Sequence, residues 1–326
     1  MSADRVKGGA VGRVRVLLPI SGLTALDYLA PAALILAPGD LVRVPLGQRQ
    51  LVGVVWDGDA LPAKAVDPTK LKPVLERLDL PGLDQPARRF MQWVARYYLA
   101  APNTVLRMAL SAPQAFDPPP TRQLLSLSGK QPDRMTPARQ KVLSALRPGE
   151  SLAPGALAER AGVSAGVVRG LLREGSLQAQ AAPADAPYPL PDPDRAGPQW
   201  SLQQAEAAAQ LVAMVKAGGY QACLLEGVTG SGKTEVYFEA IAAALADPGA
   251  QVLVLLPEIG LTAQWLERFA TRFGVPPVLW HSDLGAAERR RAWRAVNLGQ
   301  GRVVVGARSA LFLPYRDLRL IVVDEE

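Results

Sequence analysis

One short motif constrains the fold of this 326-residue chain more than any other feature of its sequence. Residues 227–234 read GVTGSGKT and fit G-x-x-x-x-G-K-[ST], the pattern of a phosphate-binding loop, or P-loop. The segment 222–227 (ACLLEG) predicts a strand that leads into the loop, and residues 235–246 predict a helix that follows it. In that setting, backbone N–H groups and the positive end of the helix point at an anion. The motif therefore predicts a nucleotide site in an α/β domain rather than a glycine-rich turn.

The residues of the loop have separate chemical roles. Glycines allow successive backbone N–H groups to approach the phosphates without a side-chain clash. The ammonium group of Lys233 is expected to reach the β- and γ-phosphate oxygens, and the hydroxyl of Thr234 to ligate Mg²⁺. The other predicted nucleotide-binding positions of the loop are Gly227, Val228, Thr229, Gly230, Ser231 and Gly232.

A second motif lies at residues 320–326, which read LIVVDEE. Four apolar residues that end in carboxylates predict a buried strand whose acidic residues lie at the carboxyl edge of a sheet, where α/β folds bind ligands. Asp324 is expected to hold Mg²⁺ through water, and Glu325 to orient the attacking water. The alternative is an acidic chain end without a role in a site.

Short apolar segments alternate with helical stretches between residues 200 and 326. Besides 222–227 and 320–324, the segments 251–257 (QVLVLLP) and 302–307 (RVVVGA) read as strands. Strands without polar alternation are buried on both faces, which is typical of a parallel sheet covered by helices on each side. Cys223 is expected to be a small buried residue of the first strand, and Trp265 and Trp293 to be core residues, with a groove-lining position as the alternative.

Two proline-rich breaks divide the chain. Residues 113–120 read PQAFDPPP, and residues 183–198 contain six prolines in sixteen positions. Neither stretch can continue a helix or a central strand, and the second predicts an extended linker over 183–199. The predicted fold is therefore multidomain α/β. Its parts are a small β-rich domain (13–113), a short helical domain (121–182) and a parallel-sheet P-loop lobe (200–326).

The first domain shows period-two alternation of apolar residues in the segments 14–18 and 41–46, followed by the apolar run 51–56. A helix is predicted over 85–99. Its apolar side is expected to consist of Phe90, Val94, Tyr97 and Tyr98.

The helical domain contains a helix, a short turn at Gly162–Ser164 and a second helix that ends at Gly175. This is the helix-turn-helix pattern, with Ser164 as the expected N-cap and the segment after Gly175 as a wing. Arg169 and Arg173 would lie on the second helix. Base readout by a winged-helix domain and an exposed helix pair used in protein contacts remain alternatives.

Charge and composition exclude several classes of protein. Lys and Arg exceed Asp and Glu by 36 to 30, and residues 1–113 alone carry a net charge of +5. That excess favours a polyanionic partner such as nucleic acid, although an arginine-rich solvated surface would look the same. A single cysteine excludes a disulfide framework or a zinc ribbon within this chain and favours a reducing cytosol. No apolar run approaches the roughly 18 residues of a membrane span, so a cytoplasmic location is expected.

Several stretches resemble the PriA family of bacterial replication-restart helicases. They cover the chain from about residue 13, and the most specific are LLEGVTGSGKTEVYFEAI (224–241), LLPEIGLTAQ (255–264), ERRRAW (288–293), GARSALF (306–312) and LIVVDEE (320–326). The resemblance implies an ATP- and Mg²⁺-dependent DNA helicase with a first RecA-like lobe over 200–326. It also implies a DNA 3′-end-binding domain over 13–113 and a winged-helix domain over 121–182. The implied partners are forked DNA with a nascent leading-strand 3′ end, single-stranded DNA, primosome proteins and single-strand-binding proteins.

The resemblance also assigns roles to individual residues. Asp27, Gly47 and Lys72 match the family positions that line the pocket for the terminal nucleotide, and Tyr28 follows Asp27 in the same motif. Gln204 lies where such helicases hydrogen-bond adenine. The predicted single-strand contacts are Thr262, Arg308 and Ser309.

Departures from the family pattern leave two functions open. The family motif continues to a histidine after the second glutamate, the family has zinc-binding cysteines, and a second lobe supplies an arginine finger. The sequence therefore predicts a truncated chain that cannot unwind DNA alone. One reading is the fork-recognition part and half of the motor of a replication-restart helicase. The other is a fork-binding scaffold for primosome assembly without ATP turnover.

Overall fold

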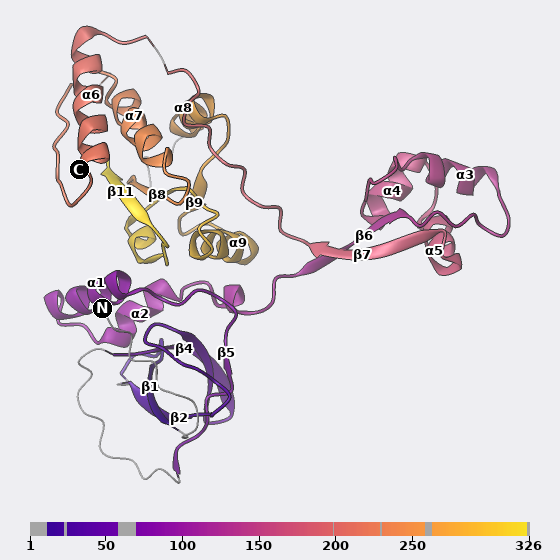
Figure 1. Ribbon diagram of the computed structural model, residues 1–326, viewed down its shortest axis with the longest axis horizontal. Coiled ribbons are helices and arrows are strands. Elements are labelled where there is room, and N and C mark those ends of the chain that lie inside the picture. Colours follow the sequence, from indigo (N-terminus) through magenta and orange to yellow (C-terminus); the bar gives the residue numbers. More distant parts are fainter. Residues whose placement is uncertain are drawn as a thin grey trace. The chain divides into compact units, whose positions relative to one another are not determined.

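The computed structural model of the chain describes residues 12–22, 25–57, 70–197, 199–228, 230–257 and 263–324 (Figure 1). The chain folds into two compact units. The smaller unit is Pro118–Ala186, and the larger one combines Met1–Asp117 with Pro187–Glu326. Among the described residues, no helix combines the length and apolar character that a bilayer crossing requires.

The larger unit begins with an antiparallel sheet of strand order β2-β1-β4-β3-β5. The alternation seen in the sequence places buried residues on both faces: Val16 and Val44 belong to one apolar cluster, and Leu17 and Leu41 to another. The β-rich character predicted for this segment is thus confirmed. The strands are β1 (Gly12–Leu17), β2 (Leu26–Ala30), β3 (Leu41–Leu46), β4 (Arg49–Val55) and β5 (Glu76–Arg77).

The helices α1 (Gln85–Tyr97) and α2 (Pro102–Ala109) follow the sheet, and the 3₁₀ turn η2 (Pro113–Phe116) comes after them. The prediction that Tyr97 and Tyr98 belong to the apolar side of α1 was wrong, because they are 67% and 70% exposed. The buried stripe runs instead through Met91, Val94 and Ala95. At about 100° per residue Tyr97 lies well away from this stripe, and Tyr98 lies beyond the last helical turn as the C-cap.

The C-terminal part of the larger unit is a parallel sheet of order β11-β8-β10-β9, as predicted for an α/β lobe. Apolar side chains of α7 and α8 cover one face around Val252 and Val254, and those of α9 cover the other around Leu253 and Val304. Trp265 and Trp293 are buried, as predicted. The elements are α6 (Leu202–Ala217), α7 (Lys233–Leu245), β8 (Gln251–Leu255), α8 (Ala263–Phe273), β9 (Val278–Trp280), α9 (Ala286–Asn297), β10 (Val303–Gly306), η4 (Arg308–Phe312) and β11 (Leu318–Val323).

The strand predicted before the P-loop is absent from the described chain. Residues 221–228 have no regular structure, Cys223 is exposed and Leu224 is 80% exposed. An apolar segment becomes a strand only when a neighbouring strand satisfies its backbone N–H and C=O groups. None of the described strands pairs with this segment, so the prediction of a buried Cys223 was also wrong.

Within the larger unit, helix α9 packs against the N-terminal sheet domain. The Trp293 indole Nε1 donates to the carbonyl oxygen of Ala109 at 2.7 Å, and the Asn297 amide donates to that of Pro81 at 2.8 Å. Both donors lie on side chains with no exposed surface. Each bond is buried and satisfies a backbone carbonyl. One apolar cluster also contains residues of both parts, so the two parts share a continuous core.

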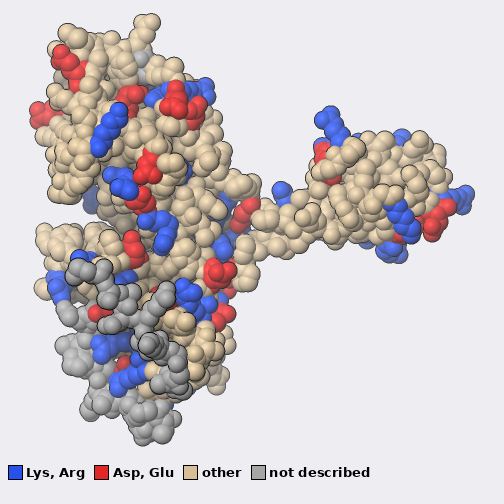
Figure 2. Space-filling model, in the orientation of Figure 1, with Lys and Arg blue, Asp and Glu red and all other residues tan. Residues whose placement is uncertain are grey.

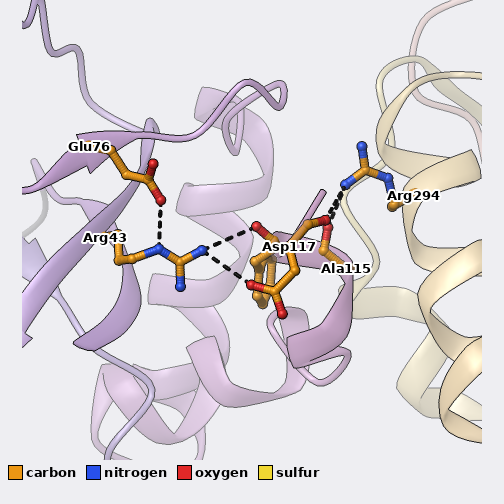
Figure 3. A network of polar contacts seen from close by, with 6 residues as sticks. Arg43, Glu76, Ala115, Asp117 and Arg294 are labelled. Atoms are coloured by element: carbon orange, nitrogen blue, oxygen red, sulfur yellow. Dashed lines mark hydrogen bonds and ion pairs between the residues drawn. The ribbon is translucent and has the colours of Figure 1, made fainter. Parts of the chain in front are cut away.

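A polar network extends this contact (Figure 3). The guanidinium group of Arg43 on β3 binds Glu76 at 2.6 Å and Asp117 at 3.3 Å. From the other side, Arg294 of α9 donates to the carbonyl oxygens of Ala115 at 2.7 Å and Asp117 at 3.3 Å. The segment after η2 is therefore held by one arginine from each part of the larger unit.

Much of the proline-rich segment predicted as an extended linker packs on the P-loop lobe. The Arg291 guanidinium lies 4.1 Å from the ring centre of Tyr188. The Asp192 N–H donates to the carbonyl oxygen of Phe273 at 3.0 Å. The larger unit resumes at Pro187, so most of the segment predicted as an extended linker over 183–199 belongs to that unit.

The smaller unit consists of three helices and a two-stranded antiparallel ribbon. The predicted turn is present: Gly162 ends α4 with φ 61°, and Ser164 is the N-cap of α5, although its hydroxyl makes no capping bond. The strand after Gly175 pairs with a strand that precedes the first helix, so the ribbon is not a hairpin formed after α5 alone. The elements are β6 (Thr121–Leu127), α3 (Pro137–Ser144), α4 (Pro154–Ala161), α5 (Ala165–Glu174) and β7 (Leu177–Pro183).

Candidate nucleotide and DNA sites

The P-loop leads directly into helix α7, whose first residue is Lys233. Gly232 caps the helix with φ 82°, and a Cβ there would lie 2.5 Å from the side-chain nitrogen of Gln204. A Cβ at Gly227 would lie 2.6 Å from the Ser231 hydroxyl. The positive φ of Gly232 therefore requires glycine there, and Gly227 lets Ser231 approach the backbone closely. Thr229 lies outside the described residues.

The ammonium group of Lys233 turns back onto the loop. Its Nζ donates to the carbonyl oxygens of Gly227 at 2.6 Å and Val228 at 3.3 Å. The two carbonyls occupy N–H donors of Lys233 that a phosphate would otherwise accept from. Phosphate binding would thus replace two backbone acceptors with a charged oxygen, for which an ammonium donor forms the stronger bond.

Gln204 contacts the same loop. It lies in the first turn of α6, where its Oε1 accepts from the N–H of Ser201 at 2.9 Å and closes a capping box. Its Nε2 donates to the carbonyl oxygen of Ser231 at 2.9 Å. The amide retains one N–H and one lone pair, which is the pattern needed to pair with the N6 and N7 edge of adenine.

Asp324 lies directly after β11, and its N–H donates to the carbonyl oxygen of Leu255 on β8 at 3.0 Å. Its carboxylate Oδ2 accepts from the Tyr237 hydroxyl at 2.7 Å. Tyr237 is on α7, one turn after Lys233, so this bond brings the acidic residue and the P-loop helix together. Burial, above all, raises the pKa of Tyr237, and the hydroxyl therefore stays protonated as a donor.

Thr234, the other predicted magnesium ligand, is the second residue of helix α7 and lies three positions before Tyr237, so the two share one side of the helix. Thr234 and Asp324 supply hard oxygen ligands, which suit Mg²⁺. Magnesium sites of nucleotide enzymes use one or two carboxylates together with substrate phosphates, so this small ligand set fits the ion. Glu325 lies outside the described residues.

Two of the three predicted single-strand contacts, Arg308 and Ser309, lie at the same edge of the sheet. Strands β10 and β11 both pair with β8 so that Gly306 and Val323 oppose Leu255, and the chain leaves all three strands at one end. Arg308 and Ser309 follow β10 in η4 and are both exposed. Thr262 lies outside the described residues.

The four residues predicted to bind a DNA 3′ end divide between two places. Lys72 donates its Nζ to the carbonyl oxygen of Gly47 at 3.3 Å, and the Tyr28 hydroxyl donates to that of Pro45 at 3.2 Å. Asp27 precedes Tyr28 on β2, so its side chain points to the opposite face of the strand. The structure therefore groups Tyr28, Gly47 and Lys72, and places Asp27 apart from them.

Asp27 borders a cavity of about 300 Å³. Its side chain is 3% exposed and forms an ion pair with Arg13, and the Nε of Arg15 lies 4.0 Å from its Oδ1. Trp56 and Asp57 complete the lining. Two guanidinium groups and an indole thus line the cavity together with two carboxylates, and guanidinium groups are common donors to nucleic-acid phosphates.

The positive charge of the N-terminal domain is partly neutralised within the fold. Besides the pairs of Arg13 and Arg43, Arg77 binds Asp40 at 3.0 Å and Arg88 binds Asp57 at 2.9 Å. On the face drawn in Figure 2, basic and acidic side chains of the described residues are interspersed over the larger unit. The net charge of +5 read from the sequence therefore overstates the basic surface offered to a polyanion.

Sequence reasoning missed Tyr237. The residue stands in an otherwise apolar stretch, YFEAIAAAL, and its ring is buried among the residues of the lobe core. Its spacing of four from Lys233 was a usable signal, because residues four apart share one face of a helix. The hydrogen bond of its hydroxyl with Asp324 could not be predicted from the sequence, because the two residues are 87 positions apart.

Comparisons with known proteins identify two domains in this chain. Residues 15–111 match the family model of the 3′DNA-binding domain of PriA, and residues 203–326 match that of the DEAD/DEAH box helicases. The replication restart protein PriA of Rickettsia felis is 31% identical over 313 residues, which are 96% of this chain and 37% of the relative. That of Haemophilus influenzae is 34% identical over 340 residues, which cover 96% of this chain and 44% of the relative.

The PriA of Bacillus subtilis is 48% identical over 103 residues, or 32% of this chain. Over the two longer matches, the chain spans about two-fifths of the relatives' own length. Both domain matches and these relatives agree, and the chain belongs to the PriA family of replication restart proteins.

Proposed function

We propose that this chain recognises forked DNA through its N-terminal domain and binds ATP with Mg²⁺ in its helicase-type lobe, as the fork-recognition part and first motor lobe of a replication-restart helicase. One observation carries the proposal. The hydrogen bond from Tyr237 to Asp324 joins the P-loop helix to the acidic residue at the carboxyl edge of the sheet, the arrangement that nucleotide binding needs.

The residues of the lobe would act as follows. Lys233 leaves the carbonyl oxygens of Gly227 and Val228 and donates to the β- and γ-phosphate oxygens. Thr234 ligates Mg²⁺ directly and Asp324 holds it through water, while Glu325 orients the attacking water. The ion, when bound, neutralises charge that develops on the phosphates. Gln204 pairs with adenine while its amide still contacts the loop.

The DNA contacts would come from several parts of the chain. Thr262, Arg308 and Ser309 meet phosphates of single-stranded DNA through hydroxyl, guanidinium and backbone N–H donors. The smaller unit acts as a winged-helix domain, in which the exposed Arg169 and Arg173 of α5 face the duplex.

The N-terminal domain would hold the 3′ end of the nascent leading strand. Lys72 and Gly47 meet the backbone on one face of the sheet, close to the Tyr28 hydroxyl. Asp27 accepts a hydrogen bond from the terminal hydroxyl once Arg13 turns toward a phosphate. We propose the same partners as the resemblance implies, namely primosome and single-strand-binding proteins, at a cytoplasmic, nucleoid-associated location.

The experiment that tests this proposal measures two bindings on the same 326-residue chain. Affinity for a labelled fork, followed by fluorescence anisotropy, should fall steeply with salt because phosphate contacts release counterions. Lys233→Ala should abolish binding of a fluorescent ATP analogue and leave fork affinity within about twofold. A fork affinity that does not respond to salt, or ATP binding that survives in Lys233→Ala, would contradict the proposal.

A further inference from the structure

The Tyr237 hydroxyl, on helix α7, has two hydrogen-bond partners from other parts of the helicase-type lobe. It donates to the Oδ2 of Asp324 at 2.7 Å and accepts from the indole Nε1 of Trp265 on α8, also at 2.7 Å. One buried hydroxyl thus contacts the acidic residue expected to hold Mg²⁺ and is itself bound by an indole N–H from helix α8.

Trp265 determines which way the hydroxyl proton points. An indole N–H can only donate, so it occupies a lone pair of the Tyr237 oxygen. A carboxylate can only accept, so the single hydroxyl proton is directed to Asp324. The direction of the two bonds is therefore set from Trp265 through Tyr237 to Asp324.

The Trp265 ring is held by the lobe core. The ring is 7% exposed and stacks on Phe269 with centroids 5.5 Å apart and an interplanar angle of 15°. Phe238 contacts it edge-on at 5.5 Å. A donor fixed by packing on two sides has little freedom to reorient, which makes it a firm anchor for the hydroxyl.

Asp324 needs such an anchor. It follows the last residue of β11, beside Val323, whose surface is about half exposed. A carboxylate at that place can adopt several rotamers. The bond from Tyr237 occupies Oδ2, so Oδ1 would be the oxygen that accepts from a metal-bound water. Partners of this kind orient metal ligands and strongly affect metal affinity.

We infer that Tyr237 and Trp265 are positioning residues that orient the carboxylate of Asp324 for the magnesium-bound nucleotide. The inference rests on the proposed nucleotide site. It adds that the aromatic core of the lobe, through a buried N–H and a buried hydroxyl, sets the magnesium requirement of nucleotide binding.

The test measures the Mg²⁺ concentration that half-saturates binding of a fluorescent ATP analogue to the full chain. Tyr237→Phe, which removes only the hydroxyl, should raise that concentration about tenfold. Binding of the analogue in EDTA should stay within about twofold, because the P-loop contacts remain. Trp265→Phe should shift the midpoint in the same direction by a smaller factor.

Two comparisons separate positioning from a general loss of structure. Tyr315 is also a buried tyrosine of this lobe, and its hydroxyl donates to the carbonyl oxygen of Ala310 at 3.1 Å, so Tyr315→Phe should leave the midpoint unchanged. Because Trp265 acts through the hydroxyl, Trp265→Phe should add no shift in the Tyr237→Phe background.

The outcomes distinguish this inference from the function on which it rests. If the unaltered chain binds the analogue without any effect of Mg²⁺, the proposed magnesium site itself is wrong. If the unaltered chain needs Mg²⁺ but Tyr237→Phe has the same midpoint, or shifts it no more than Tyr315→Phe, the positioning role is refuted while the nucleotide site stands.

Discussion

Trp293 and Ala109 are 184 positions apart in the chain, yet the indole of the first donates to the carbonyl oxygen of the second at 2.7 Å in a fully buried contact. The bond joins helix α9 of the helicase-type lobe to the end of helix α2 in the N-terminal domain. If the N-terminal domain binds DNA, it therefore does so as part of the same packed unit as the helicase-type lobe.

This contact predicts a specific loss of stability. Trp293→Phe leaves the Ala109 carbonyl buried without its donor, which costs about 1–3 kcal/mol beyond the lost packing. Trp280→Phe is a matched control, because Trp280 is equally buried but its Nε1 has no hydrogen-bond partner among the described residues. Urea unfolding should show the larger loss for Trp293→Phe. Equal losses of unfolding free energy in the two variants would mean that the hydrogen bond does not stabilise the contact between the two parts.

Removing the Asp27 carboxylate should change how the chain discriminates between forks. Asp27→Ala should erase any preference for a fork whose 3′ end abuts the junction over a fork with a gap there, as measured by competition in anisotropy. Asp79→Ala, at an exposed position of the same domain, should leave the preference intact. Undiminished discrimination in Asp27→Ala would refute the terminal-nucleotide role and leave Lys72 and Gly47 as the candidates.

The ion pair of Asp57 with Arg88 predicts a dependence of stability on pH. Two bonds of 2.9 Å from the Arg88 guanidinium lower the pKa of Asp57. A carboxyl whose pKa is lower in the folded state stabilises the fold above its unfolded pKa of about 3.9, and that contribution is lost as the pH falls through the folded value.

The measurement compares urea midpoints between pH 7 and pH 3. Asp57→Asn should be less stable than the unaltered chain at pH 7, and the difference should shrink toward pH 3. Asp133→Asn, at an exposed position of the smaller unit, should differ little at either pH. A difference for Asp57→Asn that stays constant with pH would contradict the assignment.

The salt response should depend on which arginine is removed. Arg169→Ala and Arg173→Ala take exposed cations from α5, and if these contact phosphates, each should lower the salt slope of fork binding by about one. Arg43→Ala instead breaks pairs with Glu76 and Asp117 and should destabilise the larger unit without changing the slope. Unchanged slopes for the α5 variants would favour a protein-contact role for the smaller unit.

The sequence predicted what depends on local pattern. Period-two alternation marked β1 and β3, an apolar run marked β4, and the P-loop spacing placed Gly232 and Lys233 at the start of α7. The apolar runs marked β8, β10 and β11 of the parallel sheet because such strands are buried on both faces.

What the sequence could not predict depends on partners distant in the chain. Residues 222–227 have the composition of a strand, but strand formation needs a neighbour. The prolines of 187–197 cannot form a helix, yet the arginines of α8 and α9 anchor this segment on the lobe. The bonds of Tyr237 with Asp324 and Trp265 span 87 and 28 positions, beyond any local pattern.

The most direct test of the account is calorimetric titration of ATP into the folded chain, with and without Mg²⁺. The account predicts binding that Mg²⁺ strengthens, complete loss in Lys233→Ala, and loss of only the Mg²⁺-dependent gain in Asp324→Asn. Failure of the unaltered chain to bind ATP, or equal binding by Lys233→Ala, would contradict it.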